Sequence, residues 1–380
     1  HHGMTQTHQV LVTGGAGYIG SHAVLALKDA GHQPVVIDNL TTGFGWAVPD
    51  DVPFYKGDIS DGELVARIFR EQGIEAIMHF AGSIIVPESV ENPLKYYRNN
   101  TANSRSLIES AVTAGVQHFI FSSTAATYGI PDESPVREDM PTLPINPYGL
   151  SKLMTEYMLR DVAAAHDFNY CALRYFNVAG ADPQGRTGQS TAGATHLIKV
   201  AVEAALGKRG HVSVFGTDYD TDDGTGVRDY IHVVDLAEGH VAALRRLLAH
   251  EGSFTVNLGT GQGYSVLELV AAYARACGRE LPYQIVDRRA GDAPACYADV
   301  SLAGSLLGCV PTVGLGSCAT RRGSTLRSAS LRFAGGSVGG PGCAIRNGEG
   351  VDRPNREDER RRRCNGRIRH VSNRCCGREG

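Results

Sequence analysis

Hydrophobic and polar positions alternate along the first half of the chain in a rhythm that predicts strands followed by helices. Short apolar runs, rich in β-branched residues, are typical of buried strands and lie at 9–12, 34–39, 75–82, 118–124 and 170–177. Segments with helical periodicity separate these runs and lie at 21–31, 104–115 and 148–166. Strands that alternate with helices predict an α/β fold with a Rossmann-like, doubly wound parallel sheet.

The alternation of predicted strands and helices becomes irregular after about residue 180, where long polar, glycine-rich loops begin. Such loops usually carry binding residues rather than core packing. The pattern at 233–259 predicts one more helix and strand, which we expect to return to the sheet. We therefore predict a Rossmann domain at 4–180, a smaller C-terminal substrate domain at 181–308, and the remnant of an expression tag at 1–3.

The last part of the chain differs from the rest in composition. Residues 303–380 contain 15 Arg, no Lys and six of the nine cysteines, and we find no sustained period of 2 or 3.6 there. We expect the tail at 309–380 to be disordered. A frameshifted reading of GC-rich DNA and a basic arm that binds nucleic acid are the two explanations. The absence of lysine, with Phe333 as the one aromatic residue, favours the frameshift.

Composition restricts the class of protein. An apolar content of 42%, a charged content of 20% and a net charge of −3 are ordinary for a soluble globular chain, and they give no sign of a nucleic-acid or membrane partner. No run of 18 or more apolar residues predicts a membrane span. Before the tail, only Cys171, Cys277 and Cys296 are present. They are too scattered for a disulfide framework, which indicates a reducing compartment and a cytoplasmic location.

A glycine-rich turn follows the first predicted strand. Gly14, Gly17 and Gly20 open the next helix, which is the arrangement that places a dinucleotide pyrophosphate on a helix N-terminus. Asp38 ends the second predicted strand, where a carboxylate accepts hydrogen bonds from ribose hydroxyls and repels a 2′-phosphate. These residues predict NAD rather than NADP, and the alternative is a tight turn without a ligand.

A phenol and an ammonium group are four residues apart in the segment "NPYGLSK". If a helix begins near Pro147, Tyr148 and Lys152 lie on one face of it, one turn apart. A nearby cation favours the phenolate and would lower the tyrosine pKa from about 10. The spacing therefore predicts that Tyr148 is a general base, and the alternative is an ordinary exposed helical pair.

Together with "FAG" at 80–82 and "FSST" at 121–124, these features resemble the extended short-chain dehydrogenase/reductase family. The resemblance implies that Thr124 hydrogen-bonds the substrate hydroxyl and that Tyr148 takes its proton. It also implies that Lys152 holds the cofactor ribose and lowers the pKa of the tyrosine.

Longer segments, among them "LRYFNVAGA" and "DGTGVRDYIHVVDLAEGH", are similar to the branch of that family that inverts C4 of UDP-hexoses. The resemblance implies NAD as cofactor, a UDP-sugar as substrate and a homodimer. Besides the glycines, Asp38, Tyr148 and Lys152, the implied NAD contacts are Tyr18, Ile19, Asn39, Asp58, Ile59, Phe80, Ala81, Gly82, Asn99 and Phe176. Ile84 departs from the branch, which often has lysine there.

The same resemblance implies a set of substrate contacts. The diphosphate is assigned to Asn177, Arg228 and Arg289, the uracil to Val214 and Phe215, the uridine ribose to Asp292, and the wall of the sugar pocket to Cys296. Guanidinium groups suit phosphate oxygens. Each assignment has a simpler alternative. Arg228 could form a local ion pair with Asp229, Arg289 could be a solvated surface charge, and Cys296 could be a packed core residue.

Other functions remain possible at this point. A nucleotide-sugar 4,6-dehydratase would carry an Asp–Glu pair after Thr124, where this chain has Ala125 and Ala126. A UDP-pentose 4-epimerase and a non-catalytic NAD sensor are further alternatives. The acidic segment 218–224 suggests a calcium loop, but its glycine falls one place late and no glutamate closes it. No metal is therefore expected.

Overall fold

The computed structural model describes residues 6–180, 186–187, 200, 204, 209–277 and 280–308. All of these residues belong to one structural unit, His1–Val338. The predicted tag remnant, the arginine-rich tail at 309–380 and most of the loop after residue 180 lie outside the described residues.

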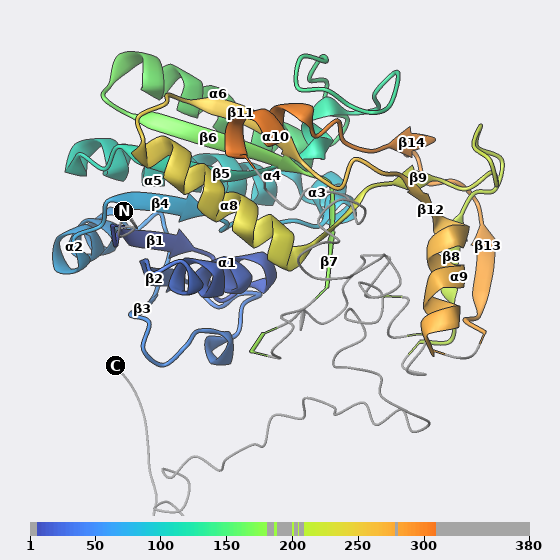
Figure 1. Ribbon diagram of the computed structural model, residues 1–380, viewed down its shortest axis with the longest axis horizontal. Coiled ribbons are helices and arrows are strands. Elements are labelled where there is room, and N and C mark those ends of the chain that lie inside the picture. The colour runs from blue at the N-terminus through green and yellow to red at the C-terminus, as the bar shows by residue number, and fades with distance from the viewer. Residues whose placement is uncertain are drawn as a thin grey trace, which may run out of the picture. The chain divides into compact units, whose positions relative to one another are not determined.

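A seven-stranded sheet forms the centre of the fold, with the strand order β11-β6-β5-β4-β1-β2-β3 (Figure 1). Every neighbouring pair is parallel, which confirms the predicted Rossmann-like sheet. The strands are β1 (Gln9–Thr13), β2 (Gln33–Asp38), β3 (Phe54–Lys56), β4 (Ala76–His79), β5 (His118–Thr124), β6 (Asn169–Tyr175) and β11 (Phe254–Leu258). The strand order reverses between β1 and β4, which is where such sheets bind nucleotides.

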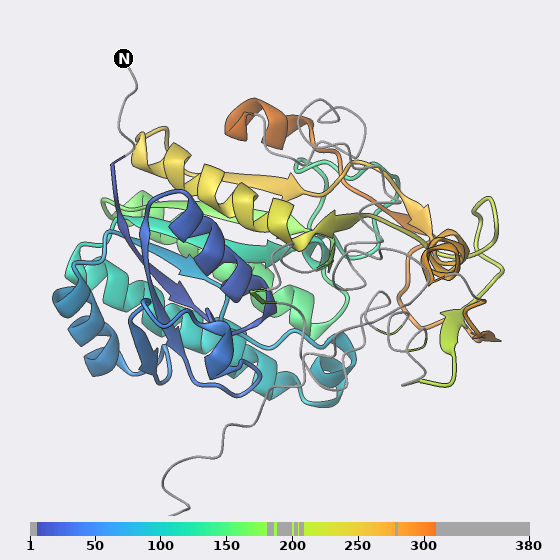
Figure 2. The ribbon, with the colours of Figure 1, turned by 60° about the horizontal axis from the view of Figure 1, so that its bottom comes forward.

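Helices cover both faces of the sheet, and Figure 2 shows α1 and α8 side by side on one of them. That face carries α1 (Tyr18–Asp29) and α8 (Val233–Leu248), and the other carries α2 (Gly62–Gln72), α5 (Asn103–Ala114) and α6 (Pro147–Ala165). The alternation along β1 explains the two cores. Val10 and Val12 belong to the cluster with α1 and α8, whereas Leu11 belongs to the cluster with α2 and α5.

The helix that carries the Tyr148–Lys152 pair begins where the sequence predicts. Asn146 caps α6, because its side chain accepts a hydrogen bond from Gly149 N at 2.8 Å, and Pro147 occupies the first helical position. Asp61 caps α2 in the same way, and Gly73 ends that helix in the left-handed conformation. Local sequence therefore fixes the starts of α2 and α6.

A helical segment between β4 and α5 was not anticipated from the sequence. It consists of α3 (Val86–Glu91), α4 (Pro93–Tyr96) and a π-helical stretch, η2 (Tyr97–Ala102). A π-helical stretch inserts an extra residue into the helix and often marks a functional region. Here it contains Asn100, of which only 1% is exposed.

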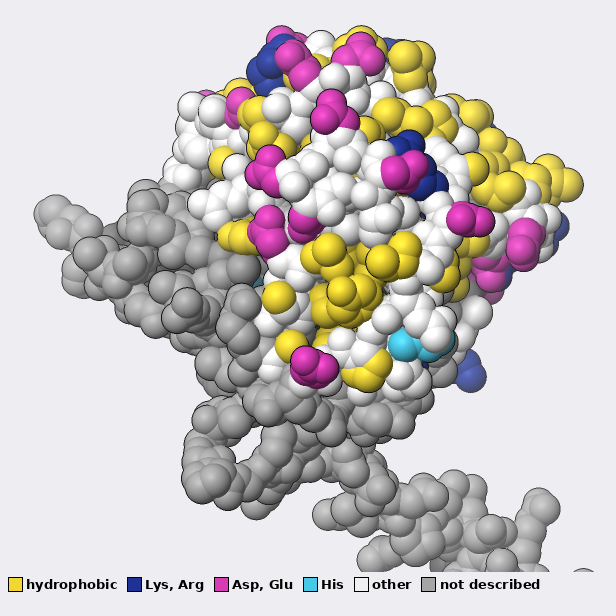
Figure 3. Space-filling view, turned by 90° about the vertical axis from the view of Figure 1, so that its right-hand side faces the viewer, with side chains coloured by type: hydrophobic (Ala, Val, Ile, Leu, Met, Phe, Trp, Pro, Cys, Tyr) yellow, Lys and Arg dark blue, Asp and Glu magenta, His cyan; other side chains and the backbone are white. Residues whose placement is uncertain are grey.

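The rest of the described chain forms smaller sheets and helices. They are η1 (Gly45–Ala47), η3 (Ala125–Tyr128), β7 (Asn177–Ala179), β8 (Val212–Phe215), β9 (Val227–Arg228), β10 (Tyr230–His232), β12 (Tyr264–Ser265), α9 (Val266–Cys277), β13 (Tyr283–Val286), β14 (Ala295–Cys296) and α10 (Ser301–Leu307). Figure 3 faces the side of the molecule on which Figure 1 shows β8, α9 and β13, and hydrophobic side chains are visible there. The exposed Tyr283 and Ile285 belong to β13. α10 packs on α8 and β11, so the end of the predicted substrate segment contacts the central sheet.

None of the helices in the described part of the chain combines the length and the apolar character that crossing a membrane requires.

Candidate active site

The three predicted catalytic residues meet where β5 ends against α6. Thr124 is the last residue of β5, and Tyr148 and Lys152 occupy successive turns at the start of α6. All three are buried, with exposures of 7%, 8% and 3% in chain order. The Thr124 side chain hydrogen-bonds to the Tyr148 phenol. The structure thus joins groups that are 24 residues apart in the sequence, at the carboxyl edge of the sheet.

Lys152 lies in an apolar environment. Its Nζ donates to the carbonyl of Ser122 at 3.3 Å and lies 5.1 Å from the centre of the Phe121 ring. Burial lowers the pKa of Lys152 to about 8. A substantial fraction of this amine is therefore neutral near pH 8.

The prediction that the Tyr148 pKa falls below its usual value is wrong. Burial raises the pKa of the phenol, and the hydrogen bond from Thr124 lowers it by less. Desolvation disfavours the phenolate, and this effect is larger than that of the Lys152 charge, which was the only effect included in the prediction. Tyr148 therefore needs further positive charge nearby before it can act as a base at neutral pH.

The glycine-rich turn packs so closely that side chains cannot enter it. Gly14 has φ +67°, and a Cβ there would lie 2.8 Å from Ala81 N. A Cβ at Gly20 would lie 2.1 Å from the carbonyl oxygen of Gly14. Thr13 Oγ1 accepts from Phe80 N at 3.1 Å and from Ala81 N at 3.2 Å. The turn and the "FAG" segment therefore form one cradle at the end of β1 and β4.

Asp38 is fixed at the end of β2. Its carboxylate accepts from Ala16 N at 3.0 Å and from Leu40 N at 2.8 Å. Burial raises the pKa of Asp38, and these two backbone hydrogen bonds lower it. A carboxylate oxygen has more than one lone pair, so each can still accept from a ribose hydroxyl.

The other predicted cofactor residues surround the same edge of the sheet. Asn39 Nδ2 donates to Asp58 Oδ1 at 2.9 Å, and Asn99 Nδ2 donates to Ser83 Oγ at 3.0 Å, one residue after Gly82. The Tyr18 hydroxyl donates to Gly180 O at 2.5 Å. Ile19 belongs to the first turn of α1, and Ile59 and Phe176 are buried.

Two of the predicted substrate residues are register partners. Arg228 on β9 pairs with Cys296 on β14. Arg228 Nη1 donates to its neighbour's carbonyl, Val227 O, at 2.8 Å. The simpler role proposed for Arg228, a pair with Asp229, is wrong. Asp229 is fully buried and accepts hydrogen bonds from Thr260 and from the backbone of Gly261 and Ala298.

The Arg289 side chain is 53% exposed, as the simpler role implies, but it also has two partners among the predicted substrate residues. Its guanidinium lies 4.3 Å from the centre of the Phe215 ring, and its Nε donates to Asp292 at 3.1 Å. Arg289 therefore contacts two other predicted substrate residues, Phe215 and Asp292. Val214, by contrast, is fully buried. Asn177 begins β7, and its backbone N–H donates to Asp229 O at 3.1 Å.

Cys296 is partly buried against the cluster of Tyr128, Val136, Phe176 and Ala298. Burial raises the pKa of its thiol to about 11, so it is a neutral, small, apolar group at physiological pH.

Sequence reasoning missed several buried polar residues next to the site. Asn100 is one of them. Its amide accepts from Ser83 N at 2.7 Å and donates to Ser83 O at 2.9 Å and to Ser151 Oγ at 3.1 Å. It therefore ties the cofactor segment to the turn of α6 that precedes Lys152. No pattern in the sequence signals this role, because Asn100 lies in the π-helical stretch, outside the predicted helices.

The acidic segment 218–224 has a structural explanation. Asp223 accepts from Thr225 N at 2.9 Å and from the hydroxyls of Thr225 and Ser265. Within the described ranges, no group of three His, Cys, Asp or Glu side chains is arranged to hold a metal ion.

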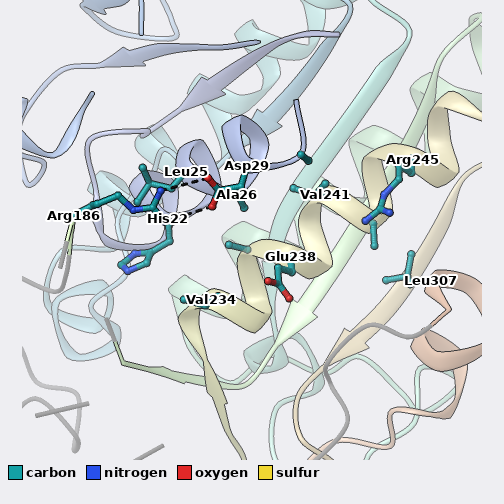
Figure 4. Close-up of a pocket in the computed structure, with 13 residues that line it drawn as sticks. His22, Leu25, Ala26, Asp29, Arg186, Val234, Glu238, Val241, Arg245 and Leu307 are labelled. Atoms are coloured by element: carbon teal, nitrogen blue, oxygen red, sulfur yellow. Dashed lines mark hydrogen bonds and ion pairs between the residues drawn. The ribbon is translucent and has the colours of Figure 1, made fainter. Parts of the chain in front are cut away.

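A cavity of about 450 Å³ lies between α1 and α8 (Figure 4). Charged residues on its walls include Glu238, Arg245 and the pair of Arg186 with Asp29, at 3.4 Å. None of the predicted catalytic residues lines it, so this cavity is not the active site.

A parallel sheet whose carboxyl edge carries a glycine cradle, a fixed carboxylate and a buried Thr–Tyr–Lys set defines an NAD-binding enzyme of the short-chain dehydrogenase/reductase type. The sequence profile of the NAD dependent epimerase/dehydratase family matches residues 10–259, and the chain belongs to this family.

Similar proteins agree with this assignment. The chain is 53% identical over 339 residues to the UDP-glucose 4-epimerase of Azospirillum brasilense, which covers 88% of this chain and 96% of that protein. The crystal structure of the Brucella ovis UDP-glucose 4-epimerase in complex with NAD superimposes with a TM-score of 0.77 and 48% identity, over 79% of this chain and 92% of that one. The Bifidobacterium longum enzyme in complex with NAD⁺ and UDP gives a TM-score of 0.76 and 41% identity, over 86% and 97%.

Proposed function

We propose that the chain catalyses the reversible, NAD-dependent inversion at C4 of a UDP-hexose, between UDP-glucose and UDP-galactose, through a 4-keto intermediate. The observation that carries this proposal is the Thr124–Tyr148 hydrogen bond beside Lys152, on the same edge of the sheet as the glycine cradle. The names of the similar proteins, and the NAD and UDP in their structures, support the cofactor and the substrate.

The roles of the residues follow from their positions. Thr124 hydrogen-bonds the 4-hydroxyl of the sugar, and Tyr148 accepts the proton from that oxygen. The cofactor, when bound in the glycine cradle, would supply reversible hydride chemistry at C4, as NAD⁺ when the hydride is removed and as NADH when it is returned to the opposite face. Tyr148 then gives the proton back to O4. Because the net redox change is zero, the cofactor stays bound through the cycle.

Tyr148 must lose its proton although burial raises its pKa. The Thr124 hydrogen bond and the positive charge of Lys152 both favour the phenolate. The positive charge of an oxidised nicotinamide ring acts in the same direction. The base therefore becomes effective in the holoenzyme, and the pKa of the cofactor-free protein does not describe it.

The substrate is held at its nucleotide end, so that the keto sugar can turn over. Arg228, Arg289 and Asn177 bind the diphosphate, and Asp292 accepts from the uridine ribose. Phe215 and the buried Val214 beside it on β8 form the uracil site. Cys296 lines the sugar pocket and is small enough to leave room for a 2-N-acetyl group, so UDP-N-acetylhexosamines are included in the proposal.

The alternatives differ in what they need after Thr124. A 4,6-dehydratase needs acidic groups to expel water, and the first two residues of η3 are Ala125 and Ala126. A non-catalytic NAD sensor would have no use for a buried Thr–Tyr–Lys set. A UDP-pentose 4-epimerase would use the same residues and differs only in the sugar that it accepts.

Product analysis with UDP-galactose tests the proposal. The NAD-loaded protein should convert it to UDP-glucose until both sugars reach equilibrium. A 4-keto-6-deoxy product would identify a dehydratase, and recovery of unchanged UDP-galactose would rule out the epimerase. Running UDP-arabinopyranose or UDP-xylose in parallel distinguishes a pentose enzyme.

We also propose a homodimer and a cytoplasmic location. Apolar side chains on α3 and α4 support the dimer, because Val90 is 63% and Leu94 75% exposed. Cys171 and Cys296 are free thiols, as expected in a reducing compartment. Light scattering behind a sizing column measures the oligomeric state, and a monomer at micromolar concentration would contradict the dimer.

A further inference from the structure

An ion pair is buried beside the proposed catalytic set. Arg174 Nη2 lies 2.6 Å from Glu156 Oε1, and Arg174 Nε lies 3.1 Å from Glu156 Oε2. The two side chains are only 9% and 6% exposed. This is the two-point geometry in which a guanidinium fork fixes both the distance and the orientation of a carboxylate.

The pair lies between the two elements that carry the catalytic residues. Glu156 follows Lys152 by one turn on α6. Ser123, which directly precedes Thr124, donates to Glu156 Oε2 at 2.6 Å. Arg174 is the register partner of Ser123 on the neighbouring strand β6. The carboxylate therefore links the ends of β5 and β6 to the middle of α6.

The same pair also reaches the segment after Thr124. The Arg174 guanidinium lies 4.9 Å from the centre of the Tyr128 ring, in η3. The Tyr128 hydroxyl donates to Asn257 Oδ1 at 2.6 Å, on β11. Thr124 is therefore held from both sides, by Ser123 before it and by η3 after it.

Stability alone does not require charges in this place. Burying two charges costs desolvation energy, and well-packed apolar residues of similar volume often serve the folded state equally well. The fork supplies something that apolar packing lacks, which is a fixed distance between a strand and a helix.

We propose that Glu156 and Arg174 are positioning residues that keep Thr124 of β5 within hydrogen-bonding distance of Tyr148 on α6. The inference rests on the proposed function for its kinetic consequence, but its geometric part is independent of the substrate. Neither residue needs to contact substrate or cofactor. Their effect is transmitted through Ser123 to Thr124, and along α6 to Tyr148.

The first test replaces both charges together, in Glu156→Leu/Arg174→Met. Because the double variant leaves no unpaired buried charge, we expect it to remain folded, with an unfolding temperature close to that of the parent. We expect kcat for UDP-galactose to fall about 10²-fold, because small misplacements of reacting groups have effects of that size. KM should change less than about twofold, since the interactions that bind the substrate equally in the ground state and the transition state are unchanged.

The matched control is Arg67→Met/Glu71→Gln. These residues form an exposed pair on α2 at 3.5 Å, far along the chain from the site. The control should retain the parental kcat, which shows that replacing an ion pair is harmless in itself.

The second test does not depend on catalysis. The neighbours of Tyr148 are Thr124, the Tyr96 ring at 6.5 Å and Tyr175, and Lys152 follows it by one turn on α6. The NAD-loaded protein and its Tyr148→Phe counterpart are titrated with base, and their ultraviolet absorbance is recorded. The difference between the two curves reports the ionisation of the Tyr148 phenol alone. The hydrogen bond from Thr124 lowers the Tyr148 pKa. In the double variant the Tyr148 titration should therefore move to higher pH than in the parent.

A single variant keeps the inference testable if the double variant does not fold. Ser123→Ala leaves the ion pair intact and removes only its link to β5, so it should move kcat and the Tyr148 titration in the same directions by smaller amounts. A parental kcat together with a parental Tyr148 titration, in the double variant or in Ser123→Ala, would overturn the inference. A parent without epimerase activity would instead refute the proposed function, and the titration would still decide the role of the pair.

Discussion

The Nζ atom of Lys152 lies 5.1 Å from the centre of the Phe121 ring and 3.3 Å from the carbonyl oxygen of Ser122. Within the described residues, no carboxylate forms an ion pair with this amine. The ammonium is thus held by a ring face and a carbonyl dipole only. An amine in this setting is poised to interact with a ligand, and it destabilises the protein while no ligand is bound.

Lys152→Met should stabilise the cofactor-free protein. Burial lowers the Lys152 pKa from 10.5 to about 8, so the unfolded chain binds this proton more tightly than the folded one. Below pH 8 the amine is charged in both states and the full cost of burying it is present. That cost corresponds to roughly 3.5 kcal/mol, from about 1.4 kcal/mol per pKa unit.

The cost disappears as the pH rises from 8 towards 10.5, where the amine is neutral in both states. Urea denaturation at pH 7 should show Lys152→Met more stable than the parent, and the difference should shrink at pH 9.5. A variant that is equally stable or less stable at pH 7 would contradict the pKa assignment.

Tyr148→Phe should remove activity without removing the cofactor. The ring keeps its packing against Tyr96, while the proton acceptor is lost. We expect turnover to fall by roughly 10²-fold or more, as for loss of a general base. NAD released on denaturation measures the bound cofactor. Turnover near the parental value would exclude Tyr148 as the base.

Acid should unfold the protein in part through His240. Its ring is fully buried beside Phe80, and burial lowers its pKa to about 4. The unfolded chain takes up this proton near pH 6.5, so stability falls as the pH drops from 6.5 to 4.

His240→Leu removes this proton uptake and fills the same apolar space. The slope of unfolding free energy against pH between 4 and 6 should decrease by up to about 1.4 kcal/mol per pH unit. His79, whose pKa burial lowers to about 3, still contributes its own slope. An unchanged slope in His240→Leu would mean that His240 is already protonated in the folded protein.

Asp38 should make the protein select NAD over NADP. Its carboxylate is fixed by Ala16 N and Leu40 N, so it cannot turn away from a 2′-phosphate. The purified protein should release NAD(H) and little NADP on denaturation. Asp38→Asn keeps the size and removes the charge, and it should narrow the difference in affinity between the two cofactors. A pool that is mostly NADP in the parent would reverse the assignment.

Cys296→Tyr should narrow the range of substrates. A tyrosine at the pocket wall would clash with a 2-N-acetyl group and spare a 2-hydroxyl. The parent should therefore epimerise both UDP-N-acetylglucosamine and UDP-glucose, and the variant should lose the first activity far more than the second. The ratio of kcat/KM for the two sugars, measured in both proteins, is the test. An unchanged ratio would place Cys296 outside the sugar pocket.

Local signals in the sequence were sufficient for much of the fold. The alternation of apolar runs and helical periodicity predicted the parallel sheet, and the Asn146–Pro147 start of α6 was readable because caps and first-turn prolines act within a few residues. The glycine turn was readable for the same reason, since its spacing is set by contacts such as that of Gly20 with Gly14 O.

Short or irregular elements could not be predicted from the sequence. β3 spans only Phe54–Lys56, and the π-helical stretch Tyr97–Ala102 has no pattern of its own, because its conformation depends on what its side chains meet across the fold. Asn100 is an example, since its partners Ser83 and Ser151 belong to other elements.

By itself the sequence determined which groups are available to the site, namely the Thr124, Tyr148 and Lys152 side chains, the glycine turn and Asp38. Only the tertiary structure decided their electrostatics. Burial raises the Tyr148 pKa although a lysine is one turn away, because desolvation depends on everything packed around a group. The partners of Asp229 and of Glu156 were decided in the same way, since they come from distant segments that no local pattern brings together.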